Sequence, residues 1–94
     1  MGKMNKKRDR MAVIYDILSI IRDKHNSIKP TPLLRYSNLS SSSFNEYYDE
    51  LISKEFIKEI TDYDGKKYIT LTDKGFKFLE KYKLITGFIE EFEL

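Results

Sequence analysis

Cysteine and histidine, which carry much of enzymatic and metal chemistry, are nearly missing from this sequence of 94 residues, so only carboxylate or hydroxyl chemistry remains to be considered. It has no cysteine and a single histidine, His25, which excludes thiolate nucleophiles, disulfides and zinc sites built from these two residue types. Glu90, Glu91 and Glu93 group three carboxylates near the end of the chain, but no substrate-binding side chains accompany them. Residues 64–67 lack the flanking residues of a phosphate-binding loop. We therefore expect no enzymatic activity, no metal, no cofactor and no small-molecule ligand.

Lysine and arginine are the chemically active side chains that the sequence does supply, and their distribution is uneven. Residues 1–10 hold five of them against one acid, whereas residues 40–55 hold four acids against Lys54. Cationic side chains bind nucleic-acid phosphates without reading the base sequence. The candidates for phosphate contact precede the first expected helix, flank the second or follow the hairpin turn: Lys6, Lys7, Arg8, Arg10, Lys29, Arg35, Lys66 and Lys67.

The length and composition indicate one folded domain. With 40% hydrophobic and 34% charged residues, the chain is too apolar to be disordered and can bury one core. No apolar run approaches the roughly 20 residues that span a bilayer, and the first residues lack the apolar region of a signal peptide. We expect a cytoplasmic protein with no membrane contact.

Local signals predict three helices in the first half of the chain. Apolar residues at intervals of three and four, from Met11 to Ile21, indicate an amphipathic helix. Thr31 followed by Pro32 predicts the start of a short second helix, with the threonine as N-cap and the proline at the first helical position. Asn38 is expected to end this helix and Ser40 to cap the third, so a tight turn separates the two.

The second half of the chain predicts a hairpin and a last helix. Residues 56–60 and 68–71 are rich in β-branched and aromatic residues, and Asp64-Gly65 between them is typical of a two-residue type I′ turn. Thr72 is expected to cap a helix that opens with Asp73. Helix, short helix, tight turn, helix, hairpin and helix is the order of a winged helix-turn-helix, a mostly helical α+β fold with a two-stranded wing.

Three segments resemble a known family. Residues 6–18 (KKRDRMAVIYDIL), 38–40 (NLS) and 68–79 (YITLTDKGFKFL) are similar to small archaeal winged-helix DNA-binding proteins, which include predicted transcriptional regulators and coiled-coil chromatin-type dimers. The resemblance covers nearly the whole chain and implies binding of duplex DNA as a homodimer. Two positions depart from the family pattern, because Arg35 stands where tyrosine is usual and Glu55 where glycine is common.

The third helix is the expected recognition helix. Its outward residues near the N-terminus are Ser41, Ser42, Ser43, Asn45 and Glu46, of which Ser41, Ser42 and Asn45 are the main candidates for base contact and Glu46 is a further one. Serine can hydrogen-bond to any base, asparagine pairs with adenine and glutamate accepts from cytosine. Asp49 and Glu50 would repel phosphate, which argues against DNA binding unless both face away from the backbone.

The last helix carries more apolar residues than one domain can cover. We expect the domain to cover Phe76 and Leu79, whereas an apolar seam at steps of four and three continues toward the C-terminus. The expected dimer-interface residues are Phe78, Tyr82, Ile85, Phe88, Ile89 and Phe92. Gly87 could kink the helix, end it or admit a partner backbone. If Gly87 ends the helix, residues 88–94 fold back on their own domain.

The sequence therefore divides into a basic arm (1–10), a winged helix-turn-helix domain (11–79) and a continuation of the C-terminal dimerisation helix (80–94). We expect a homodimer that binds double-stranded DNA, as a transcriptional regulator or as a chromatin-type protein. The alternative is a winged-helix protein–protein interaction module without direct DNA binding, in which the acidic third helix docks a basic partner.

Overall fold

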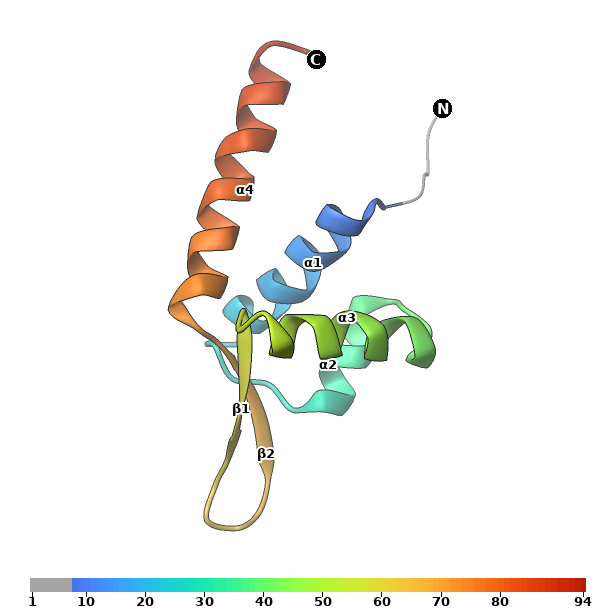
Figure 1. Cartoon of the computed structure of the whole chain (residues 1–94), viewed down its shortest axis with the longest axis vertical. Coiled ribbons are helices and arrows are strands. Elements are labelled where there is room, and N and C mark those ends of the chain that lie inside the picture. Colours follow the sequence, from blue (N-terminus) through green and yellow to red (C-terminus); the bar gives the residue numbers. More distant parts are fainter. Residues whose placement is uncertain (1–7) are drawn as a thin grey trace.

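The computed structural model describes residues 8–94, which form four helices and one two-stranded antiparallel sheet (Figure 1). In chain order the elements are α1 (Arg10–Asp23), α2 (Pro30–Ser37), α3 (Ser41–Ser53), β1 (Ile57–Thr61), β2 (Lys67–Leu71) and α4 (Asp73–Glu91). The expected class is confirmed: a mostly helical α+β fold, in which β1 and β2 form a projecting wing and α4 is a long C-terminal helix. No helix in the described range is long and apolar enough to cross a membrane.

The first helix begins one residue earlier than predicted. Asp9 is its N-cap, and the Asp9 carboxylate accepts a hydrogen bond from the Ala12 N–H at 2.8 Å. Arg10 is therefore the first helical residue. The predicted apolar stripe is buried from Val13 onward, whereas Met11 in the first turn remains 46% exposed.

The second helix also begins earlier than the sequence predicted. It starts at Pro30, after an extended Lys29 that provides no side-chain cap. Thr31 is not the N-cap, because Pro30 occupies the first helical position, where its fixed φ and its missing N–H fit. The end of α2 is confirmed, since Asn38 is left-handed with φ 60°. Ser40 caps α3 by accepting a first-turn N–H at 3.2 Å.

The tip of the wing differs from the predicted turn. Residues 62–66 connect the two strands, and only Gly65 among them is left-handed, with φ 82°. A type I′ turn needs positive φ at both central residues, so the prediction for Asp64-Gly65 is wrong. The Asp62 carboxylate holds the tip instead, because it accepts the N–H groups of Asp64 and Lys66 at 2.9 Å each. The longer loop is stable because this side chain satisfies two backbone donors.

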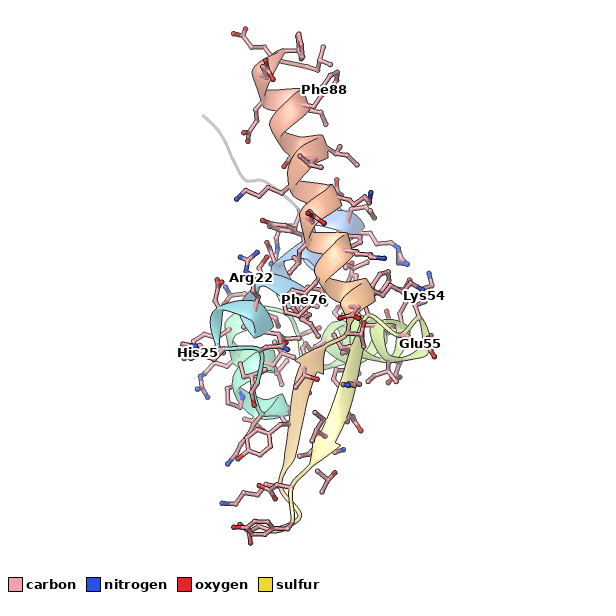
Figure 2. All side chains as sticks on the ribbon, turned by 90° about the vertical axis from the view of Figure 1, so that its left-hand side faces the viewer. Arg22, His25, Lys54, Glu55, Phe76 and Phe88 are labelled. Carbon is pink, nitrogen blue, oxygen red and sulfur yellow. The ribbon has the colours of Figure 1, made fainter. Side chains whose placement is uncertain are left out.

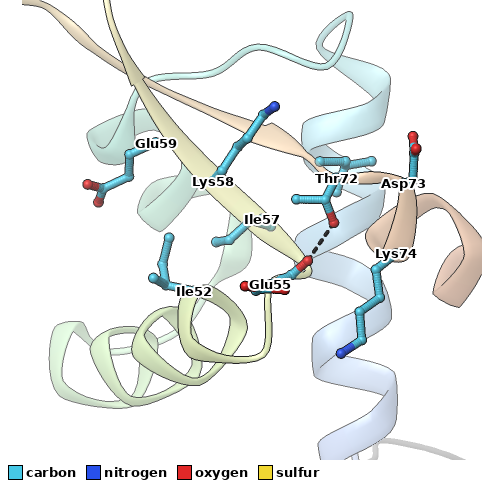
Figure 3. A pocket seen from close by; sticks show the side chains of 9 residues that line it. Ile52, Glu55, Ile57, Lys58, Glu59, Thr72, Asp73 and Lys74 are labelled. Atoms are coloured by element: carbon cyan, nitrogen blue, oxygen red, sulfur yellow. Dashed lines mark hydrogen bonds between the residues drawn. The ribbon is translucent and has the colours of Figure 1, made fainter.

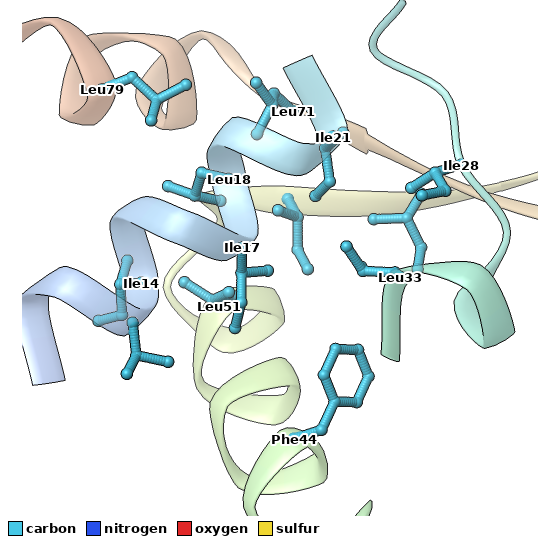
Figure 4. Close-up of a cluster of buried hydrophobic side chains, with 13 residues drawn as sticks. Ile14, Ile17, Leu18, Ile21, Ile28, Leu33, Phe44, Leu51, Leu71 and Leu79 are labelled. Carbon is cyan, nitrogen blue, oxygen red and sulfur yellow. The ribbon is translucent and has the colours of Figure 1, made fainter. Parts of the chain in front are cut away.

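A single hydrophobic core joins all six elements (Figure 4). At the base of the wing, Ile57 pairs with Leu71, and Ile28 in the loop before α2 bridges to Ile69. The core residues are Val13, Ile14, Ile17, Leu18, Ile21, Ile28, Leu33, Phe44, Leu51, Ile57, Ile69, Leu71 and Leu79. Because α3 contributes Phe44 and Leu51 to this core, the opposite face of α3 must point outward.

The corner between α3 and β1 depends on Glu55, whose backbone is left-handed with φ 64°. This positive φ explains why glycine is common here in the resembled family. The Glu55 carbonyl accepts a hydrogen bond from the Thr72 hydroxyl (Figure 3). The Lys54 carbonyl accepts one from the Lys74 ammonium at 2.8 Å, so the corner is fastened to the start of α4. An open groove of about 780 Å³ with charges of both signs lies beside it.

The last helix is continuous through Gly87 to Glu91, so an end at Gly87 is wrong. Leu79 is buried as predicted, but Phe76 is 41% exposed, which corrects the expectation that the domain covers it. The second half of α4 projects beyond the other elements, and Phe88 lies on this projecting part (Figures 1 and 2).

Candidate nucleic-acid interface

The outward face of α3 carries small polar and acidic side chains. Ser42, Asn45 and Asp49 are exposed and share one helix face, because they are spaced by three and four residues. This face lies opposite Phe44 and Leu51, which are buried. Ser41 at the start of the helix is also exposed. The structure thus places the main predicted base-contacting residues, Ser41, Ser42 and Asn45, at the surface of the expected recognition helix, and the further candidate Glu46 is exposed as well.

The two acids that argued against DNA binding point in different directions. Glu50 forms ion pairs with Arg10 on α1 and with Lys54, the latter at 2.9 Å. Its charge is therefore neutralised on the side of α3 that faces α1. Asp49 remains on the outward face and belongs to no ion pair within residues 8–94.

The basic residues of the predicted arm are engaged with the domain where the structure describes them. The Arg8 guanidinium donates to the Asp16 carboxylate at 2.8 Å and to the Ser37 carbonyl at 3.0 Å, which ties the start of α1 to the end of α2. Arg10 pairs with Glu50. Residues 6 and 7 lie outside the described range.

Two groups of cations and tyrosines lie beside α2, and we call them together the α2 margin: Lys24 and Arg35 with Tyr36, and Lys29 with Tyr68. The Lys24 ammonium is 4.6 Å and the Arg35 guanidinium carbon 5.5 Å from the centre of the Tyr36 ring. The Lys29 ammonium is 5.9 Å from the Tyr68 ring. Lys24, and after it Arg35, lowers the pKa of the Tyr36 hydroxyl below its usual value. Within the described chain, none of the three cations has a carboxylate at ion-pair distance.

Sequence reasoning identified Lys29 and Arg35 but missed Lys24, Tyr36 and Tyr68 as members of this margin. Lys24 follows α1 and Tyr68 belongs to β2, so both reach α2 only through the tertiary fold. The exposed Tyr36, directly after Arg35, was the one signal in the sequence that could have indicated an aromatic neighbour. The nearby Arg22 and His25 lie on the opposite side of the body from Lys54 and Glu55 (Figure 2).

The wing carries the remaining predicted cations. Lys66 is exposed at the tip, and the Lys67 ammonium lies 3.6 Å from the Glu59 carboxylate. The Tyr48 hydroxyl of α3 donates to the same carboxylate, so Glu59 links α3 to both strands of the wing. Burial, and after it the hydrogen bond to Glu59, raises the pKa of Tyr48. Tyr63 at the tip is almost fully exposed.

The predicted dimer-interface residues fall into two groups. Phe78 and Tyr82 pack within the domain: Phe78 lies 5.5 Å from the Phe56 ring centre, and Tyr82 lies 4.8 Å from that of Tyr15. The other four are exposed on the projecting part of α4, at 56% for Ile85, 56% for Phe88, 40% for Ile89 and 57% for Phe92. The structure therefore leaves four of the six available to a partner.

The arrangement of α2, tight turn, α3 and wing defines a winged helix-turn-helix. The winged helix-turn-helix family model matches residues 7–90, and the chain belongs to that family. A curated relative, the uncharacterized protein MJ0290 of Methanocaldococcus jannaschii, is 36% identical over 75 residues, which cover 80% of this chain. The chain spans only about a third (32%) of the length of that relative.

Solved structures with the same fold come from different sources. Sso10a-2, a DNA-binding protein from Sulfolobus solfataricus, superposes with a TM-score of 0.72 at 20% identity, over 92% of this chain and 86% of the other. F93 from STIV, a winged-helix DNA-binding protein, has a TM-score of 0.71 at 23% identity, over 85% and 91%. Oxidized MarR from E. coli has a TM-score of 0.70 at 24% identity, over 81% and 54%. At these identities the likeness shows a shared fold.

Proposed function

We propose that this protein binds double-stranded DNA, with α3 in the major groove and the α2 margin and the wing along the phosphates. The observation that carries the proposal is the polar outward face of α3 together with the cations of the neighbouring α2 margin, which pair with no carboxylate in the part of the chain that the structure describes. α3 contacts α2 and also β1, so both cationic regions lie next to the reading helix. Sso10a-2 and F93, which share the fold, are described as DNA-binding proteins, and this supports the proposal.

The proposed phosphate contacts differ in how readily they form. Lys29 and Arg35 have no carboxylate to leave, and the same holds for Lys24 within residues 8–94. Arg8, Arg10 and Lys67 must first separate from Asp16, Glu50 and Glu59, which costs little because ion pairs near the surface contribute about 0–1 kcal/mol. The other proposed contacts are Lys66 to phosphate, and Ser41, Ser42 and Asn45 to bases.

We also propose that the projecting half of α4 forms a homodimer. Ile85, Phe88, Ile89 and Phe92 form an apolar strip with no cover within the described chain. Such a strip on a small protein is typical of an interface.

The charges of α4 favour an antiparallel pair. Its first half contains four lysines against Asp73 and Glu80, whereas residues 84–94 contain three glutamates and no base. Across the exposed strip, an antiparallel pair places the glutamates of the two copies at opposite ends, whereas a parallel pair would set them against one another.

Fluorescence anisotropy with a labelled duplex tests the proposed function. We expect binding at low salt that weakens steeply as salt rises, since phosphate contacts release counterions. Absence of binding at 50 mM salt would refute DNA binding and favour a protein–protein module. Footprinting then separates the two proposed roles, because a defined site indicates a transcriptional regulator and uniform protection a chromatin-type protein. Light scattering at micromolar concentration checks the dimer independently.

A further inference from the structure

The reading face of α3 offers hydrogen-bond acceptors and no cation. No lysine or arginine occurs anywhere in Ser41–Ser53, so the side chains that most often read guanine are missing from the helix. The exposed row includes Ser42, Asn45 and Asp49, and the exposed Glu46 lies beside it on the side toward Arg10. Of the adjacent acids Asp49 and Glu50, only Asp49 lies on this row, because Glu50 forms ion pairs with Arg10 and Lys54 on the side of α3 that faces α1.

The spacing of the row matches the spacing of base pairs. A helix rises about 1.5 Å per residue, so Ser42 and Asp49 lie roughly 10 Å apart along the axis, which is about three base-pair steps of 3.4 Å. Asn45 and Asp49 lie roughly 6 Å apart, about two steps. Each side chain can therefore face a different base pair of one short site.

The chemistry of a carboxylate limits what Asp49 can accept in the major groove. Cytosine presents its N4 amino group there as a donor, whereas guanine presents only the acceptors N7 and O6, which a carboxylate repels. Asparagine pairs with the N6 and N7 edge of adenine. On DNA that lacks the matching cytosine, the Asp49 carboxylate finds no donor and is repelled by the phosphates, which weakens binding to unrelated sequences.

We propose that Asp49 is a specificity-determining residue, which accepts a hydrogen bond from the N4 amino group of a cytosine about two base pairs from an adenine read by Asn45. This inference rests on the proposed DNA-binding function. It assigns to Asp49 the cytosine contact that the sequence favoured for Glu46, because Glu46 lines a small hollow between α1 and α3 with Arg10 and Glu50.

Glu46 provides a matched control for the charge of Asp49. Both acids are exposed on α3 and carry the same charge, but Glu46 lies on the side toward α1, where it lines the hollow with Arg10 and Glu50, and Asp49 does not line that hollow. Removing either charge strengthens binding to unrelated DNA through reduced repulsion. Only removal of Asp49 should change the preference among bases.

Selection of bound duplexes from a random pool, followed by anisotropy, tests the inference. The wild type should select sites with a C·G pair about two steps from an A·T pair. Kd is then measured for the selected duplex, for the same duplex with C·G changed to T·A, and for an unrelated duplex. Asp49→Ala should reduce the preference for C·G over T·A by about 5-fold or more, while Glu46→Ala leaves it unchanged.

Three results would overturn the inference, and they separate it from the proposed function. The role of Asp49 is overturned, but DNA binding is not, if the selection shows no C·G preference. The same holds if Asp49→Ala changes Kd for all three duplexes by one common factor, as Glu46→Ala is expected to do. A wild type that binds no duplex at 50 mM salt overturns both proposals. Circular dichroism verifies that each variant is folded, as expected for exposed positions.

Discussion

Removal of two cations from the α2 margin should flatten the salt dependence of DNA binding. The double variant Lys29→Ala/Arg35→Ala leaves the core intact, because both side chains are exposed. Neither cation is held by a carboxylate in the described chain, so each is expected to make a full phosphate contact. The slope of log K against log[salt] is about −0.9 per contact, so two lost contacts flatten it by about 1.8 per bound protomer.

This change in slope has a measurable size. A fourfold rise in salt, from 50 to 200 mM, weakens each phosphate contact by roughly 3.5-fold, so the double variant should lose about 12-fold less affinity over this range than the wild type does. Anisotropy titrations of one labelled duplex at four or five salt concentrations measure both slopes.

A matched variant separates local contact from total charge. Lys77→Ala/Lys83→Ala removes the same charge from exposed positions of α4, an element that carries none of the proposed DNA contacts. Its slope should stay close to that of the wild type. If the α2-margin variant keeps the wild-type slope, or if both variants flatten it equally, the assignment of these phosphate contacts is wrong.

Three further predictions concern the dimer, the packing of α4 and the wing. Ile85→Glu/Ile89→Glu should yield monomers by light scattering and weaken DNA binding through lost bivalency, and an unaltered protein that is itself monomeric would contradict this. Gly75→Ala should destabilise the fold by about 1–3 kcal/mol in thermal unfolding, because the new methyl group would overlap the Phe56 carbonyl oxygen. Gly87→Ala should stabilise α4 by up to about 1 kcal/mol, because the space around Gly87 is open and alanine favours the helix. Because the pKa of Tyr48 is raised in the folded state, its contribution to the unfolding free energy is complete below the usual pKa of 10.0 and is lost as pH rises above that value. Tyr48→Phe should therefore show a smaller fall in unfolding free energy in alkaline solution than the wild type. An equal fall in both proteins would refute the link.

The elements of this fold were predictable because their signals act within a few residues. Asn38, Ser40 and Thr72 are found at the helix ends where the sequence placed them, since a cap satisfies backbone groups of its own helix. The errors are also local. The start of α2 and the tip of the wing were wrong because Pro30 and Asp62 offered competing local solutions of similar quality.

The sequence by itself also determined which side chains could bind DNA, but not which of them are free to do so. Asp49 and Glu50 are adjacent and chemically alike, and only the packing of α1 against α3 draws Glu50 to Arg10 and leaves Asp49 outward. In the same way, the domain covers Tyr82 with Tyr15 and leaves Ile85 exposed, although both belong to one apolar seam. The tertiary structure decides which of these side chains are paired or covered, because Arg10 and Tyr15 come from a distant part of the chain. The spacing of residues within one helix does not predict which other helix will pack against it.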